Sequence, residues 1–165
     1  MGQDVERRTF SREDRTRYRQ KVRRCLDAFA KMLQESLFDF ERPMTGLEIE
    51  LNLVDARTEP AMRNEEILSA IADPDFVTEL GQFNIEINVQ PRRLADGGIT
   101  QFEEQVRASL NAAELKARTR DTHMVMVGIL PTLRVRDVTR STLSNNPRYA
   151  LLNDQIFAAR GEDLH

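Results

Sequence analysis

The sequence predicts an α+β domain with a small, mainly antiparallel sheet and helices packed on one face of it. Segments 47–53 and 83–89 alternate apolar and polar residues, the period-two pattern of strands with one buried face. Other segments repeat apolar residues at the three- and four-residue spacing of amphipathic helices. With 165 residues, 40% hydrophobic and 31% charged, the chain is long enough for one ordinary domain with a real core.

The first expected element is a long amphipathic helix, with Ser11 and Asp14 as a capping box and an end between Phe38 and Pro43. Its apolar positions recur at helical spacing, at Tyr18, Val22, Cys25, Leu26, Phe29, Met32, Leu33 and Leu37. The single cysteine, Cys25, lies on this apolar face, so we expect a buried, inert thiol. We expect residues 1–43 to form this helix and a linker, separate from the domain at 44–165.

A strand over Thr45–Val54, a turn over Asp55–Pro60 and a short helix over Asn64–Ala72 follow. A second strand region spans 76–89 and is interrupted at 80–82.

Two interpretations of this interruption stay open. A β-bulge at Gly81 would bury Leu80 and bring Glu79 to the same face as Glu86. A tight hairpin at the same place is the alternative.

The C-terminal half contributes a helix, an apolar strand and a last helix. Thr100 is the expected N-cap of the helix over 101–120. The run 124–130 is apolar without alternation, which is typical of a central strand covered on both faces. After a polar loop over 139–146, a helix is expected from Pro147 to just before Gly161.

The polar sides of the two alternating strands carry carboxylates. On the first strand Glu48 and Glu50 share a face with Asn52, and on the second Glu86 lies between two further asparagines, Asn84 and Asn88. Residues two apart on a strand are separated by about 6.6 Å and neighbouring strands by about 4.8 Å, so adjacent strands would bring these carboxylates together. Mg²⁺ or Mn²⁺ would relieve their repulsion. An ordinary solvated outer face of an antiparallel sheet explains the same pattern.

Four motifs connect the chain to a family. They are Thr45–Leu51 (TGLEIEL), Glu79–Asn88 (ELGQFNIEIN), Val127–Thr132 (VGILPT) and Asn146–Tyr149 (NPRY). With these motifs in this order, the chain after about residue 43 resembles the N-terminal part of bacterial type 2 glutamate–cysteine ligases. These enzymes are carboxylate–amine ligases related in fold to glutamine synthetase.

The resemblance implies a site and a reaction. It implies that Glu48, Glu50 and Glu86 are catalytic residues that bind Mg²⁺ (or Mn²⁺) ions holding the ATP phosphates, with Glu79 as a fourth acidic ligand. It also implies that ATP phosphorylates the side-chain carboxylate of glutamate, after which the amine of cysteine or a related compound forms an amide.

Further residues are candidates for the nucleotide. Arg140 and Arg148 could pair with a phosphate or carboxylate, because a guanidinium suits bidentate anion recognition. Ordinary surface charge explains either arginine equally well. Asn88 could line the site as a hydrogen-bonding amide.

Relatives in this family are longer and supply further contacts from later strands. We therefore expect an incomplete glutamine synthetase-like catalytic domain in 44–165, with little or no ligase activity from this chain alone. The exposed strand edges of such a half-sheet predict self-association. A non-catalytic binding or assembly module that kept the fold is the alternative function. A metal-dependent hydrolase is disfavoured, because the sequence offers no nucleophile or His cluster.

Other partners are not expected. The net charge of −3 argues against nucleic acid, and Tyr18 is the single aromatic residue among the basic residues of segment 12–24. No apolar run approaches the length of a membrane span and no signal-peptide core is visible, which predicts a cytoplasmic location without membrane contact.

Overall fold

The structure is a computed structural model that describes residues 9–95 and 97–160. The chain divides into two compact units, Met1–Pro43 and Met44–His165. Each unit is described by itself.

The described part of the first unit is dominated by helix α1, Arg12–Gln34. The predicted capping box is confirmed: the Ser11 hydroxyl accepts a hydrogen bond from the Asp14 amide at 3.1 Å, and the Asp14 carboxylate accepts one from the Ser11 amide at 3.1 Å. The helix ends at Gln34, before the predicted end at 38–43, and Ser36 just beyond it has a positive φ of 53°. The expectation for Cys25 was wrong, because its thiol is exposed.

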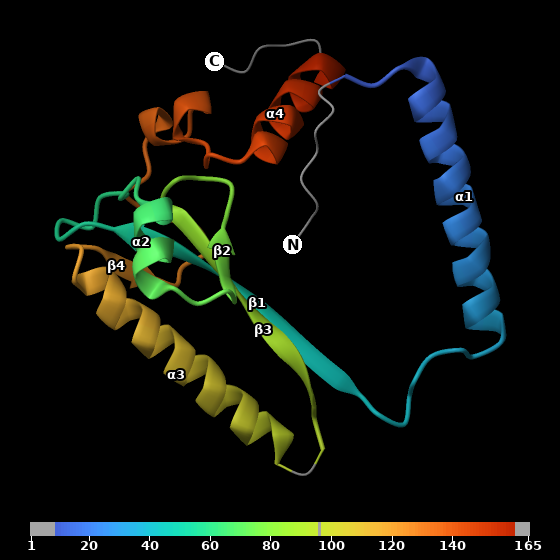
Figure 1. The fold of residues 1–165 in the computed structure, drawn as a ribbon, viewed down its shortest axis with the longest axis horizontal. Coiled ribbons are helices and arrows are strands. Elements are labelled where there is room, and N and C mark those ends of the chain that lie inside the picture. Colours follow the sequence, from blue (N-terminus) through green and yellow to red (C-terminus); the bar gives the residue numbers. More distant parts are fainter. Residues whose placement is uncertain (1–8, 96, 161–165) are drawn as a thin grey trace. The chain divides into compact units, whose positions relative to one another are not determined.

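The second unit contains a four-stranded antiparallel sheet. Its strands are β1 (Met44–Val54), β2 (Phe76–Thr78), β3 (Asn84–Arg93) and β4 (His123–Val125), in the order β2-β3-β1-β4 (Figure 1). The predicted α+β class and mainly antiparallel sheet are therefore confirmed.

Helices α2 (Asn64–Ile71) and α3 (Gly98–Arg118) pack on one face of this sheet. The buried core joins alternate strand residues to apolar side chains of both helices, and its members are Leu51, Leu53, Ala61, Ile67, Phe76, Ile85, Ile87, Val89, Ala113 and Ala117. Leu47 was expected on this core face but is 40% exposed. It lies near the N-terminal end of β1, whereas the buried residues of this strand are at its C-terminal end.

The start of α3 differs from the prediction. Gly97, with φ of 79°, is the N-cap in place of Thr100. A Cβ on Gly98 would lie 1.9 Å from the carbonyl oxygen of Arg93, so only glycine allows the end of β3 and the first turn of α3 to approach this closely.

The interruption at 80–82 is a hairpin connection. Strands β2 and β3 pair antiparallel on either side of it, with Val77 opposite Glu86. The strands do form a hairpin, but its connection runs over 79–83 and is longer than the tight turn expected at 80–82. The bulge is wrong, as is the expected burial of Leu80, which is 46% exposed. Phe83 is the connection's buried apolar side chain.

The apolar run 124–130 is not a central strand. Only His123–Val125 pairs, and it does so at the edge of the sheet against β1. Met126 and Ile129 are 67% and 80% exposed, while Leu130 is buried. The rest of the run is a loop on the way to two short 3₁₀ turns, η1 (Val135–Asp137) and η2 (Arg140–Thr142), and to helix α4 (Pro147–Arg160). Among the described residues, none of the helices is long and apolar enough to cross a membrane.

Candidate metal site

The face of the sheet opposite α2 and α3 carries polar side chains in facing pairs. The register of β1 against β3 places Glu48 opposite Asn88 and Glu50 opposite Glu86. It also places Asn52 opposite Asn84, and the Asn84 amide donates to the Asn52 side-chain oxygen at 3.0 Å. Because the apolar residues between them are buried, this register fixes which side chains reach the polar face.

Three carboxylates converge on this face. Glu50 comes from β1, Glu86 from β3 and Glu79 from the connection that follows β2, and one oxygen of each lies within 4.8 Å of the others. We call Glu50, Glu79 and Glu86 the acidic trio. Glu48 does not belong to it; its side chain lines an adjoining pocket of about 350 Å³ together with Glu50, Asn52 and Asn84.

The pKa of Glu79 shows the repulsion between the carboxylates of the trio. Burial raises the pKa of Glu79, and the neighbouring carboxylates of Glu50 and Glu86 raise it further. Arg148 opposes this shift through its positive charge. Three negative groups this close therefore favour any positive charge that can lie between them.

The donor set fits a hard divalent cation. Mg²⁺ and Mn²⁺ take oxygen ligands, and Mg²⁺ sites commonly combine one or two carboxylates with water and phosphate oxygens. Asn88, on the same face, has a buried side-chain oxygen that accepts no hydrogen bond from the described residues. That oxygen is a further acceptor suited to a metal-bound water.

A buried polar network holds Glu79 in place. The side-chain amide of Asn64, at the first position of α2, donates to the Ser144 hydroxyl at 2.7 Å and to the carbonyl oxygens of Gly81 and Asn84 at 3.3 Å each. The Ser144 hydroxyl in turn donates to the carbonyl oxygen of Glu79. Asn64 and Ser144 are 2% and 4% exposed, so their hydrogen bonds form out of water.

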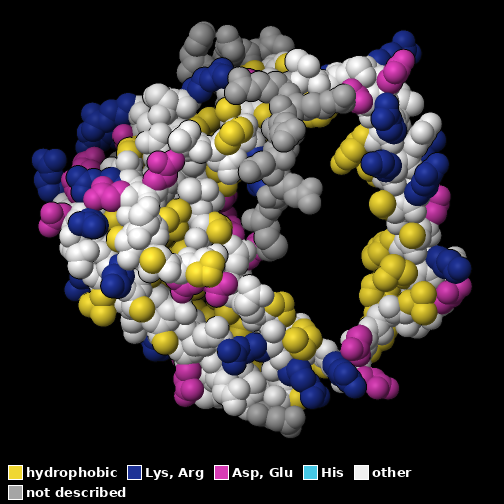
Figure 2. All heavy atoms as spheres, in the orientation of Figure 1, with side chains coloured by type: hydrophobic (Ala, Val, Ile, Leu, Met, Phe, Trp, Pro, Cys, Tyr) yellow, Lys and Arg dark blue, Asp and Glu magenta, His cyan; other side chains and the backbone are white. Residues whose placement is uncertain are grey.

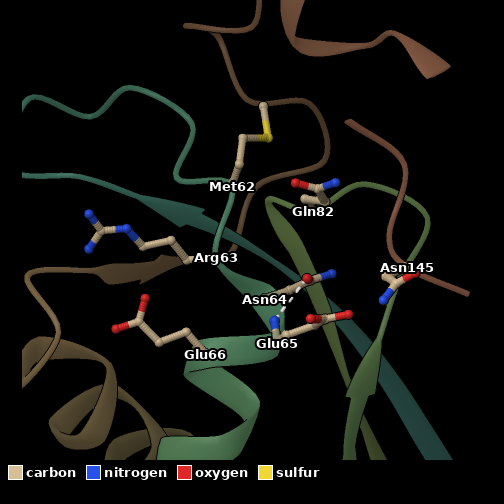
Figure 3. Close-up of a pocket in the computed structure, with 7 residues that line it drawn as sticks. All are labelled: Met62, Arg63, Asn64, Glu65, Glu66, Gln82 and Asn145. Atoms are coloured by element: carbon tan, nitrogen blue, oxygen red, sulfur yellow. Dashed lines mark hydrogen bonds between the residues drawn. The ribbon is translucent and has the colours of Figure 1, made fainter. Parts of the chain in front are cut away.

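Figure 3 shows the start of α2, where Asn64 also accepts a hydrogen bond from the Glu65 amide at 2.9 Å. Asn64 lines a pocket of about 260 Å³ with Gln82 of the β2–β3 connection and Asn145 of the loop before α4.

The loop before α4 is fastened to the same connection. The Gln82 side chain donates to the carbonyl oxygens of Ser141 and Leu143 at 3.1 and 2.9 Å. The buried Tyr149 hydroxyl of α4 donates to the carbonyl oxygen of Thr78 at 3.1 Å, one residue before Glu79. Segment 139–149 thus supports the acidic trio from outside the sheet.

The two candidate arginines differ in their surroundings. Arg148 lies 5.5 Å from the ring centroid of Tyr149 and close enough to Glu79 to lower its pKa. Arg140 forms an ion pair with Asp154 of α4 at 2.9 Å and lines a separate pocket of about 730 Å³. The structure brings Arg148, and not Arg140, toward the trio.

The supporting residues were missed by sequence reasoning. Asn64 is separated from Ser144 by 80 positions, and nothing in the local sequence indicates that pairing. Tyr149 did stand within one of the four family motifs, which was the only available signal.

One of three comparisons with known proteins found a match. The family model of glutamate–cysteine ligase family 2 matches residues 44–160, a range that holds the sheet, the acidic trio and segment 139–149. Searches of the curated proteins and of the solved structures found no match.

Proposed function

The chain belongs to glutamate–cysteine ligase family 2, and we propose that its acidic trio binds Mg²⁺ or Mn²⁺ with ATP in a carboxylate–amine ligase. The observation that carries the proposal is the convergence of Glu50, Glu79 and Glu86 within 4.8 Å on the polar face of the sheet. Three unrelated elements supply these carboxylates, which an ordinary solvated sheet face does not require.

The proposed reaction joins the side-chain carboxylate of glutamate to an amine, with cysteine or a related amino compound as acceptor. The glutamate oxygen takes the terminal phosphoryl group as ADP leaves. The amine nitrogen then attacks the activated carbon, phosphate leaves and the nitrogen loses a proton. A bound divalent cation would neutralise charge on the transferring phosphoryl group.

The residues of this chain position and balance charge, and none of them need act as a nucleophile. Glu50, Glu79 and Glu86 would hold the cation, and Glu48 and Asn88 would extend the donor set along the same face. Arg148 would offer its positive charge to a phosphate beside Glu79. Arg140 is the weaker candidate for nucleotide contact, because Asp154 already neutralises it.

Metal binding tests the site directly. We expect the chain to bind Mn²⁺, measured by electron paramagnetic resonance titration, and Glu50→Gln to weaken binding at least about tenfold, a loss of about 1.4 kcal/mol. Glu48→Gln should weaken it less, because Glu48 lies outside the trio.

Glu65→Gln is the matched control for Glu50→Gln. It makes the same change at an exposed carboxylate on α2 and should leave Mn²⁺ affinity unchanged. Equal affinity in wild type and Glu50→Gln would refute the site.

Turnover tests the reaction. ADP release from Mg²⁺–ATP should be measured with glutamate and a panel of amines in the longest natural chain that contains this sequence. We expect amine-dependent release that Glu50→Gln abolishes, and little or none from the 165 residues alone. Metal binding without any ADP release in the longest chain would instead favour a non-catalytic binding module.

A further inference from the structure

Helix α1 presents an apolar face that its own unit covers in part, where the ring of Phe38 meets that of Phe29 edge-on with the centroids 6.1 Å apart. None of its residues is buried, and Figure 2 shows hydrophobic side chains gathered along one edge of this helix. Tyr18, Val22, Leu26, Phe29 and Leu33 follow one another at spacings of three or four residues and are 38–70% exposed. Helix α1 also precedes the part of the chain that matches the family. We call these five residues, together with Cys25, the α1 stripe.

Charge is distributed unevenly along the same helix. Residues 12–24 hold seven Arg or Lys against two acidic residues, a net charge of +5. Residues 27–41, which include the last turns of α1 and the segment after it, hold four Asp or Glu against Lys31, a net charge of −3. One end of the unit is therefore basic and the other acidic.

We propose that α1 is a dimerisation surface whose occupant is α1 of a second copy of this chain, packed antiparallel. An antiparallel pair sets the basic end of each helix beside the acidic end of the other, and it opposes their helix dipoles. A parallel pair would instead place the seven basic side chains of one helix beside the same seven of the other, fourteen in all, and these would repel one another.

The apolar residues agree with the antiparallel arrangement. If the two-fold axis passes between Cys25 and Leu26, the middle of the α1 stripe, Tyr18 lies beside Leu33 of the second copy and Val22 beside Phe29. Each aromatic ring then meets an aliphatic side chain, which packs large against small. A parallel pair would place Phe29 on Phe29 and leave Val22 on Val22.

The same register brings Arg12 and Arg15, in the first turns of α1, to the end of α1 in the second copy, where Glu35 is the C-cap and Asp39 follows in the next segment. Arg24 lies on the side of the helix away from the α1 stripe. Charge reversal at Arg15 and at Arg24 therefore alters net charge equally, but only Arg15 should affect the interface.

Sedimentation equilibrium of the full chain tests the proposal. We expect a dimer, and we expect Arg12→Glu with Arg15→Glu to raise its dissociation constant about tenfold through the two symmetric contacts. Adding Glu35→Arg and Asp39→Arg to that variant should recover most of the affinity. Arg24→Glu is the control with little effect, and Phe29→Ser should abolish the dimer.

Spin labels measure whether the two α1 helices run antiparallel or parallel. With Cys25→Ser and a label at Glu13→Cys, in the first turn of α1, an antiparallel pair separates the two labels by about 38 Å along the axis, from 1.5 Å per residue. A parallel pair would hold the two helices about 10 Å apart at that level.

Three results would overturn the proposal. One is a monomer at every concentration, whether α1 is then covered by the rest of its own chain or partitions onto anionic lipid vesicles. The second is a dimer with the short label distance. The third is a dimer that persists in Phe29→Ser.

Discussion

At the scale of single residues, Asn64 joins several parts of the second unit through its side chain. Its side-chain amide nitrogen donates to three acceptors and its oxygen accepts from the Glu65 amide, so both ends of this buried side chain are hydrogen-bonded. One side chain thereby links the start of α2 to the connection that carries Glu79 and to Ser144. A buried amide of this kind stabilises mainly through the cost of leaving its partners unpaired.

We expect Asn64→Ala to lower the free energy of unfolding by about 2–3 kcal/mol, because it removes the buried donor to the Ser144 hydroxyl and to the carbonyl oxygens of Gly81 and Asn84. Urea denaturation measures the change. Asn145→Ala is the matched control: Asn145 lines the same pocket but is exposed, and its removal should cost less than about 0.5 kcal/mol.

Ser144→Ala tests the link from this network to the metal site. It should weaken Mn²⁺ binding, while Ser144→Thr, which keeps a hydroxyl, should retain more of that binding.

For the Asn64 prediction, equal stability of the Asn64→Ala and Asn145→Ala variants would contradict the role assigned to Asn64.

The sequence could indicate that Glu50 and Glu86 lie on the polar face of the sheet, because their neighbours along each strand are apolar and face the core. Glu79 was associated with Glu86 for the wrong reason. A bulge was one of two interpretations, and the hairpin delivers the same carboxylate while leaving Leu80 exposed. The role of Asn64 could not be anticipated, because tertiary packing sets its partners. These partners lie between 17 and 80 positions further along the chain.

At the scale of elements, Glu114 connects α3 to the edge strand β4. One of its oxygens accepts from Arg118 at 2.8 Å and lies 3.1 Å from the His123 ring nitrogen, and the other accepts from the Met124 amide at 2.8 Å. Burial tends to raise the pKa of Glu114, but the hydrogen bonds from Arg118, Met124 and His123 outweigh it and hold the pKa below its usual range.

This lowered pKa gives Glu114 a pH-dependent effect on stability. A carboxyl whose pKa falls on folding stabilises the folded chain fully above its unfolded pKa of about 4.3, and that contribution disappears as the pH falls through the folded value. We expect Glu114→Gln to cost about 1 kcal/mol at neutral pH, and much less at about pH 3. Urea denaturation of both proteins at the two pH values measures this difference.

Glu103→Gln is the control on the same helix. Glu103 also pairs with an arginine four residues on, Arg107 at 2.8 Å, but both side chains are largely exposed. Its replacement should change stability by less than about 0.5 kcal/mol at either pH. A Glu114→Gln penalty that stays constant with pH would argue against the ionised carboxylate as its source.

The elements themselves were predictable to different degrees. Period-two alternation identified β1 and the regular part of β3, because one face of each is buried and the other is polar. Residues 124–130 have no such alternation, and an apolar run alone does not distinguish a central strand from an edge strand followed by a loop. There Leu130 alone is buried, and Met126 and Ile129 remain exposed.

At the scale of the whole molecule, the fold class followed from the helical and alternating patterns together. The sheet order could not follow from them, because β4 pairs with β1 across more than sixty intervening positions. The same limit applies to segment 139–149, whose hydrogen bonds to the β2–β3 connection give the loop its place.

The last prediction concerns which unit carries the core and the metal site and which one carries the dimer interface. Every buried apolar residue of the described chain lies between Leu51 and Tyr149, so the core and the acidic trio are built within the second unit. A chain that begins at Met44 should therefore keep its urea midpoint and bind Mn²⁺ within about threefold of the full chain, or about 0.7 kcal/mol. Because the α1 stripe is gone, it should also sediment as a monomer.

A truncated chain that fails to fold would show that the first unit completes the core. A truncated chain that folds and still dimerises would instead move the interface to the sheet edges, where unpaired strands offer the competing surface.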